Sequence, residues 1–317
     1  MNSPKPLIPS ILCLLGLAAV AARGAPAEPS SDEITAVAGK TSADYVRARQ
    51  PNGSFKEETY AFGEGGHFGG PMTDPSIDKL KFIDVARVIS VPLAEQNYWP
   101  DKDPKGTKLL IMLYWGLTDV PPPVSSSAAY DNLNSIQSRI AQEAGLAKAR
   151  AAGSVKGYHS ASSNAGASDA DLDELSSAVT VLNLVNQQRA QTDFYNASML
   201  GYDAEGVIGT EYGNYVRGTP LAVRRDDLIG EIEDHRYFVV LMAYDFQLMW
   251  RQKKHKLLWE TRFSIRQRHN NFDSALAGMA KAASQYFGQN THGLVRKDVP
   301  LGRVEVGAVQ SLGTVEK

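Results

Sequence analysis

The most regular pattern of apolar and polar positions lies in residues 237–250 and 257–267. In the first segment every even position is apolar, whereas the odd positions are apolar only as far as Ala243 and become polar at Asp245 and Gln247. The second segment alternates more strictly between apolar and polar residues. Because successive side chains of a strand point to opposite faces, both segments are predicted to be strands, and the first is buried on both faces at its start.

A basic turn at residues 251–256 joins these strands into a predicted antiparallel hairpin. With the turn centred on Lys253 and Lys254, the predicted register pairs apolar residues: Trp250 with Leu257, Leu248 with Trp259, Tyr244 with Phe263 and Met242 with Ile265. On the other face the same register sets Asp245 opposite Arg262 and Gln247 opposite Glu260. We interpret these charges as cross-strand pairs on a solvated face rather than as a charged cleft.

Helical and strand patterns flank the hairpin. Residues 271–287 carry an apolar stripe and end before Gly288, which predicts a helix that completes a ββα unit. Upstream, residues 55–62 are a predicted strand, the glycine-rich residues 63–70 a loop, residues 77–96 a helix that Pro92 ends or kinks, and residues 97–106 a turn. Residues 109–115 are continuously apolar, as in a central strand, so a parallel βαβ unit is predicted.

A helical hairpin interrupts these two units. Residues 129–151 have Leu133, Ile136, Ile140 and Ala144 on one face, and residues 169–197 repeat apolar residues at Leu172, Leu175, Val179 and Leu182. A glycine- and serine-rich linker at residues 153–168 separates the two helices, and a further helix runs from Thr219 to His235.

The predicted fold class is therefore α/β, with a mixed sheet built from the βαβ and ββα units and an inserted helical hairpin. Residues 26–54 are predicted to be a flexible leader, residues 55–120 the first half of the core, residues 121–200 the insertion and residues 201–317 the second half of the core. The tail of that second half is predicted to add a short edge strand at residues 302–309.

Residues 1–25 have the features of a secretory signal peptide: Lys5, an apolar run from residue 7 to 22, and small residues at the candidate cleavage sites. The run is too short for a bilayer span and contains Pro9, so we expect no transmembrane segment after cleavage. Cys13 follows Leu12, where a lipoprotein signal needs a small residue, so lipidation is not expected. We expect an exported protein, periplasmic or extracellular, whose mature chain contains no cysteine.

Charge further restricts the function. The chain of 317 residues has a formal net charge of −2, and cleavage after Gly24 removes Lys5 and Arg23 but no acid, which leaves 31 cations against 35 acids. This balance argues against general nucleic-acid binding, and we expect no nucleic-acid partner.

Sequence motifs for catalysis are absent. The chain contains neither H-E-x-x-H nor G-x-S-x-G, and Gly39-Lys40-Thr41 resembles the end of a phosphate loop but has Ile34 where such a loop needs glycine. The six histidines have no metal-ligand spacing. These observations predict no cofactor, no metal and no catalytic residue, and they weigh against an enzyme without excluding one.

Two groups of residues are candidates for ligand binding. Tyrosines in a glycine-rich region are candidates for stacking on a glycan or clasping a peptide: Tyr195, Tyr202, Tyr212 and Tyr215. Basic residues of the hairpin turn are candidates for binding a polyanion: Arg251, Lys253, Lys254 and Lys256.

Three functional hypotheses follow. The first is an exported, non-catalytic binding or envelope-accessory protein, with the tyrosine-rich loops or the helical insertion as its contact surface and another envelope protein or a glycan as its partner. In organisation alone, with no shared motif, the chain is similar to periplasmic accessory modules of bacterial envelope assembly. The second is a hydrolase outside the cytoplasm that uses paired carboxylates, either Asp245 with Glu260 or Glu231 with Asp234. The third is polyanion binding by the basic hairpin face.

Overall fold

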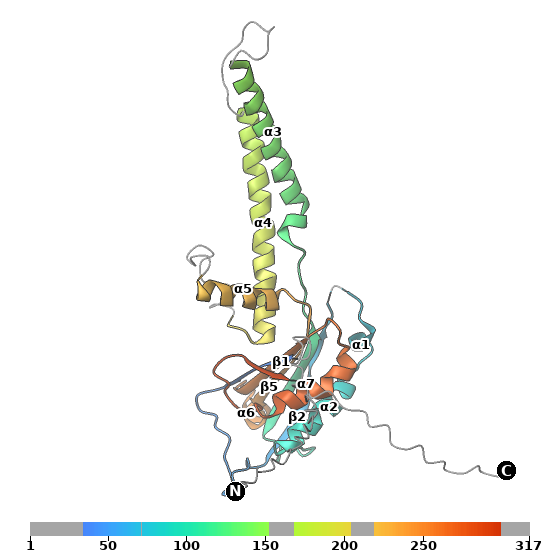
Figure 1. Cartoon of the computed structure of the whole chain (residues 1–317). Helices are drawn as coiled ribbons and strands as arrows, with labels where there is room; N and C mark the ends of the chain where they lie inside the picture. Colours follow the sequence, from blue (N-terminus) through green and yellow to red (C-terminus); the bar gives the residue numbers. More distant parts are fainter. Residues whose placement is uncertain (1–33, 71, 152–167, 204–218, 299–317) are drawn as a thin grey trace, which may run out of the picture.

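The computed structural model describes residues 34–70, 72–151, 168–203 and 219–298 (Figure 1). The strands in these ranges are β1 (Ile34–Thr41), β2 (Glu58–Phe68), β3 (Tyr98–Pro100), β4 (Leu109–Leu117), β5 (Arg236–Asp245), β6 (Leu257–Arg266) and β7 (Val295–Asp298). The helices are α1 (Pro75–Asp78), α2 (Phe82–Glu95), the 3-10 turn η2 (Val124–Ser126), α3 (Ala128–Ala151), α4 (Asp169–Leu200), α5 (Pro220–Ile232), α6 (Phe246–Gln252) and α7 (Phe272–Ser284).

The described strands form one mixed sheet in the order β3-β2-β4-β5-β6-β1-β7. β2 pairs with β4 in parallel, and α1 and α2 lie between these two strands in the chain. β5 pairs antiparallel with both β4 and β6, and α7 follows β6. The predicted βαβ and ββα units are therefore both present, which confirms the α/β class with a mixed sheet.

Helices cover both faces of this sheet. α2 and α7 pack over the main core, which includes Val239, Leu241 and Trp259. The C-terminal end of α4 and the C-terminal part of α5 pack on the opposite face, against Phe238 and Val240. Because β5 is covered on both faces, its odd and even positions are both apolar, as the sequence predicted for the start of this strand.

α3 and α4 form a helical pair, here called the arm, which projects away from the sheet (Figure 1). This pair confirms the predicted helical insertion. In each helix the less exposed residues follow the alternating spacing of three and four that is typical of coiled coils. On α3 and α4 they include Leu133, Ile136, Ile140, Leu175, Ala178, Leu182 and Val185.

Only two of the four residues in the predicted apolar stripe of α4 face α3. Leu175 and Leu182 lie in the seam between the helices, but Leu172 and Val179 are exposed. On α3, Ala144 is exposed as well. Apolar residues occur on several sides of α4, so spacing within one helix does not determine which side meets the partner.

The base of the arm is held directly on the sheet. The guanidinium of Arg262 in β6 donates a hydrogen bond of 2.6 Å to the carbonyl of Ser198 in α4. Gly201 ends α4 in the left-handed conformation, with a φ of 84°. A Cβ atom at Gly201 would lie 2.5 Å from the Cβ of Ala38 in β1, so only glycine permits this close approach.

The β5–β6 hairpin is present, but its predicted register is wrong. Ala243 pairs with Trp259 and Val239 with Phe263, because β5 ends at Asp245. Most of the register is therefore shifted from the prediction by five residues, an odd number that exchanges the two faces of the strand. The odd-numbered residues of β5 face the main core and the even-numbered residues face α4 and α5.

A short helix replaces the second half of the predicted strand. The carboxylate of Asp245 accepts a hydrogen bond of 2.9 Å from the backbone N of Leu248 and so caps the start of α6. The predicted pairing of Asp245 with Arg262 and of Gln247 with Glu260 is therefore wrong. Arg262 instead forms an ion pair of 3.0 Å with Glu260 of its own strand.

Two segments predicted to be irregular are strands. Residues 26–54, predicted as a flexible leader, contain β1, which lies between β6 and β7. The glycine-rich residues 63–70, predicted as a loop, belong largely to β2. The glycines there accommodate the neighbouring strand, because a Cβ at Gly65 would lie 2.5 Å from the ring of Tyr114 in β4.

Three smaller predictions concern element boundaries. Residues 98–100, predicted as part of a turn, form the edge strand β3, and Pro92 lies inside α2 rather than at its end. The edge strand predicted at residues 302–309 lies outside the described residues. Among the described strands, β7 forms one edge of the sheet and pairs with β1.

Candidate functional site

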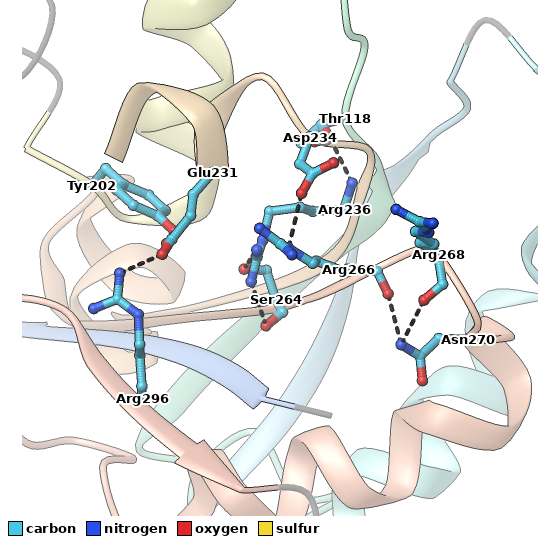
Figure 2. A network of polar contacts seen from close by, with 10 residues as sticks. All are labelled: Thr118, Tyr202, Glu231, Asp234, Arg236, Ser264, Arg266, Arg268, Asn270 and Arg296. Carbon is cyan, nitrogen blue, oxygen red and sulfur yellow. Dashed lines mark hydrogen bonds and ion pairs between the residues drawn. The ribbon is translucent and has the colours of Figure 1, made fainter. Parts of the chain in front are cut away.

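Three arginines project from neighbouring strands on the sheet face that α4 and α5 cover (Figure 2). Arg236 of β5 pairs directly with Arg266 of β6. Arg296 of β7 pairs with Ala36 of β1, which in turn pairs with Ser264, two residues before Arg266. Because paired residues share a face, the three guanidinium groups lie on the same side of the sheet.

Glu231 of α5 neutralises Arg296. Its carboxylate lies 2.7 Å from a guanidinium nitrogen of Arg296 and accepts a hydrogen bond from the hydroxyl of Tyr202. Burial alone would raise the pKa of Glu231, but the hydrogen bonds from Tyr202 and Arg296 outweigh it, so the pKa is lowered. Glu231 is thus held as a carboxylate and is a poor proton donor.

Arg266 and Arg236 have different partners. Arg266 forms an ion pair of 2.8 Å with Asp234. Arg236 is only 4% exposed, and its guanidinium donates to the hydroxyl and the carbonyl of Ser264, at 3.2 and 3.4 Å. Its backbone N donates to the hydroxyl of Thr118 at 2.9 Å. The guanidinium of Arg236 is therefore buried and hydrogen-bonded to the neutral residue Ser264.

The backbone after Arg266 is also constrained. The side-chain amide of Asn270 donates to the carbonyls of Arg266 and Arg268, at 2.9 and 3.3 Å (Figure 2). These contacts hold the turn between β6 and α7 and so help to position Arg266. They add rigidity to one end of the arginine-bearing face.

A cavity of about 1040 Å³ lies beside this network, between α5 and the sheet. Its lining is mixed in charge and contains four cations and four acids: Lys40, Arg224, Arg266, Arg296, Asp203, Asp226, Asp227 and Glu231. Such a lining suits a polar ligand better than an apolar one. Both carboxylates proposed as an acid–base pair from the sequence, Glu231 and Asp234, are ion-paired with arginines here.

Asp245 and Glu260, the second predicted carboxylate pair, each interact with a different part of the structure. Asp245 caps α6, and Glu260 forms its ion pair with Arg262. Both interactions are those of structural residues. At both positions of the sequence hypothesis, the predicted carboxylates therefore take part in ion pairs or, for Asp245, in a helix cap.

Of the four predicted tyrosines, the structure describes Tyr195 and Tyr202. Tyr202 is 5% exposed and its hydroxyl bonds to Glu231, so its ring offers no stacking surface. Tyr195 lies on α4 and is half exposed, beside a second cavity between α4 and the segment at Pro121 and Pro122. Tyr212 and Tyr215 lie outside the described residues. Only Tyr195 of the described pair is placed to contact a partner.

The predicted basic residues cluster around α6. Arg251, Lys253 and Lys254 are exposed, whereas Lys256 forms an ion pair with Asp44. Lys253 ends α6 in the left-handed conformation. Three of the four predicted cations therefore point to solvent.

Sequence reasoning missed one buried acid at the base of the arm. Asp193 of α4 is 2% exposed, and one of its carboxylate oxygens has no hydrogen-bond partner among the described residues. Burial, together with the adjacent carboxylate of Glu233, raises the pKa of Asp193 to about 6, and Arg189 offsets only part of this effect. Arg189 itself lies 2.6 Å from Glu233. No motif marks Asp193, because its burial depends on how α4 meets α5.

Within residues 34–70, 72–151, 168–203 and 219–298, no three His, Cys, Asp or Glu side chains are grouped as metal ligands. Across the same ranges, no helix is long and apolar enough to cross a membrane.

Comparison with known proteins adds little. No protein-family model and no curated protein matches the chain. A solved structure of a PDZ domain protein from Parabacteroides distasonis ATCC 8503 is similar at a TM-score of 0.34 and 11% sequence identity, over 83% of this chain and 38% of that one. A likeness at this level supports no conclusion about fold or function.

Proposed function

We propose that this is an exported, non-catalytic binding protein whose contact surface is the arm. The observation that carries the proposal is the exposure of large apolar side chains on α4. Val181 and Leu184 are 50% and 56% exposed, although they lie in the middle of a long helix. A helix that is apolar on several sides is normally covered on those sides.

The exposed residues flank the seam rather than forming part of it. At 3.6 residues per turn, Val181, Leu184 and Tyr195 share one side of α4. Leu172 and Val179, seven residues apart, share the other side. The single helix α3 can cover only the seam between these two sides, so each flank is available to a further helix or an extended segment.

Covering the exposed parts of these side chains would favour association with a partner. Burying one large aliphatic side chain stabilises an association by about 1.5–3 kcal/mol, and roughly half of that for a side chain that is already half buried. Two such residues on one flank, together with the ring of Tyr195, would supply a compact apolar centre of the kind that dominates protein interfaces. Export of the protein is part of this proposal and rests on the signal-like residues 1–25.

Photo-crosslinking tests the arm directly. The crosslinking amino acid p-benzoylphenylalanine replaces Val181 or Leu184 in one pair of variants and Val91 in a matched control. Val91 lies on α2 and is 61% exposed, so it presents a similar side chain away from the arm. We expect an adduct of one defined mass from both arm positions, formed in the cells that make the protein, and none from Val91.

A charge substitution then links the adduct to the apolar flank. The variant Val181→Glu should lose the adduct formed from position 184, while its circular dichroism spectrum and unfolding midpoint stay unchanged. Equal labelling from Val91, or an adduct consisting only of two copies of this chain, would contradict the proposal. In the second case the flank would be a dimer contact and not a site for a different partner.

A further inference from the structure

A second surface lies at the opposite end of the molecule from the arm. β5 begins at Arg236, beside α5 and the base of the arm, and ends at Asp245, where α6 begins (Figure 1). We define the basic tip as residues 101–108 and 245–256. It is independent of the arm in position, and the inference drawn from it does not rest on the proposed function.

Backbone and side-chain hydrogen bonds hold the two segments of the basic tip together. The backbone N of Phe246 donates to the carbonyl of Lys108 at 2.9 Å. The side-chain amide of Gln247 donates to the carbonyls of Pro104 and Thr107, both at 2.7 Å. The lysines of residues 101–108 are therefore fixed beside those that follow α6.

The basic tip carries an excess of positive charge. Its seven cations exceed its three acids by four. The cations are Lys102, Lys105, Lys108, Arg251, Lys253, Lys254 and Lys256, and the acids are Asp101, Asp103 and Asp245. Lys256 is neutralised by Asp44, and the three acids accept hydrogen bonds from backbone N–H groups of the tip itself. The remaining lysines and Arg251 stay available for an anionic partner.

An exposed aromatic residue lies among these cations. Trp250 is 42% exposed at the last turn of α6, and its ring stacks on Phe246 with 6.4 Å between the centroids. The guanidinium of Arg251 lies 5.9 Å from the centre of the Trp250 ring. A free polyanion needs only the positive charges, whereas a bilayer surface also favours tryptophan at the level of the lipid headgroups.

We infer that the basic tip binds the surface of an anionic lipid bilayer, with lysines and Arg251 against the lipid headgroups and the Trp250 ring inserted between them. Basic side chains near such a surface are attracted by its negative potential, and the attraction weakens as salt screens it. The arm, attached at the other end of β5, then extends away from the membrane.

Vesicle co-sedimentation tests the charge requirement. The purified protein is mixed with vesicles of phosphatidylcholine alone or with added phosphatidylglycerol. We expect binding only to the anionic vesicles, loss of binding at high salt, and at least a roughly tenfold weaker partition for Lys253→Glu/Lys254→Glu. The charge-matched control Lys79→Glu/Lys148→Glu changes two exposed lysines elsewhere and should bind like the native chain.

Tryptophan fluorescence tests insertion. Brominated lipids quench only rings that enter the bilayer, and we expect quenching that disappears in Trp250→Phe but persists in Trp99→Phe. Trp115 and Trp259 are buried and cannot contribute. Absence of binding to anionic vesicles would overturn the inference, as would quenching that persists in Trp250→Phe. Binding to heparin or DNA without binding to vesicles would overturn it too, and would identify a soluble polyanion as the ligand.

Discussion

The arm and the sheet bury their apolar residues in opposite ways. In the sheet, neighbouring residues of β5 such as Phe238 and Val239 point to opposite faces, and both are buried because helices cover each face. In α3 the only fully buried apolar residue among those described is Ile136, and α4 leaves Leu184 more than half exposed. The centre of the sheet is therefore covered on both faces, whereas the arm has uncovered apolar surface.

Because of this difference, the apolar residues of the sheet mainly stabilise the fold, whereas those of the arm are available for contact with a partner. A side chain surrounded on all sides contributes to the free energy of unfolding, while a half-exposed side chain contributes mainly when a partner covers it. Polar contacts join the two regions: Arg262 donates to the carbonyl of Ser198, and the amide of Asn196 donates to the carbonyl of Asp119 at 2.6 Å. The arm is thus fixed at its base and exposed along its length.

The largest effect should come from truncating the core of the sheet. Phe263 is fully buried beside Phe287, so Phe263→Ala should lower the free energy of unfolding by about 3–5 kcal/mol in urea titrations. Leu184→Ala, which removes an exposed side chain of the arm, should change it by less than about 0.5 kcal/mol. Should Phe263→Ala fail to fold, Phe263→Leu provides a milder test, and equal effects in core and arm would contradict the comparison.

A smaller effect, dependent on pH, is expected where the arm meets α5. The pKa of Asp193 is about 6 in the folded protein against an ordinary value of 3.8 for an aspartate, so the folded state binds the proton more tightly. Stability contributed by this group is therefore present at low pH and is lost as pH rises through 6. Asp193→Asn should be about 2–3 kcal/mol more stable than the native chain at pH 7.5 and nearly equal to it at pH 4.

Urea titrations at several pH values measure this difference. Glu143→Gln, which alters an exposed acid on α3, should track the native chain at every pH. If the difference in unfolding free energy between the native chain and Asp193→Asn does not grow with pH, Asp193 is not buried as a protonated acid at the base of the arm.

Two glycine substitutions should have opposite signs. Gly201→Ala places a Cβ against Ala38 in a left-handed conformation and should destabilise the protein by about 2 kcal/mol. Gly145 lies within α3 with open space around it, so Gly145→Ala should stabilise the arm by about 0.5–1 kcal/mol. Thermal unfolding followed at 222 nm measures both, and a stabilising Gly201→Ala would show that the base of the arm is not in tight contact with the sheet.

The elements that were predicted correctly have strong local patterns. β4 is a continuous apolar run, α3 has a stripe at helical spacing, and α5 begins with Thr219 as cap and Pro220 in its first turn. Each pattern is determined by a few adjacent residues. The pairing of α3 with α4 followed because the two helices are consecutive in the chain, separated only by the glycine- and serine-rich residues 153–168.

The errors occurred where neighbouring strands decide the outcome. β1 has the modest sequence ITAVAGKT and is a strand because β6 and β7 pair with it on both sides. The glycines of β2 look like a loop until Tyr114 of β4 occupies the space that they leave. In the hairpin, the cap formed by Asp245 ended β5 early and moved the register by five residues.

The candidate site was even less accessible to sequence reasoning. Arg236, Arg266 and Arg296 come from three strands that meet only in the folded sheet, and their partner Glu231 comes from α5. Charged residues of this kind look like ordinary surface positions in the sequence. Only the basic turn around α6, where Arg251, Lys253 and Lys254 are adjacent in the chain, was recognisable as a cluster beforehand.

The amino-acid sequence alone determined the α/β class, the presence of the helical insertion and the position of the basic turn, because each depends on interactions between residues close in the chain. Only the tertiary structure decided the order and register of the strands, which side of α4 stays uncovered, and the burial of Asp193 and Arg236. These features depend on which distant segments pack together, and that choice is set by the free energy of the whole fold and not by any local pattern.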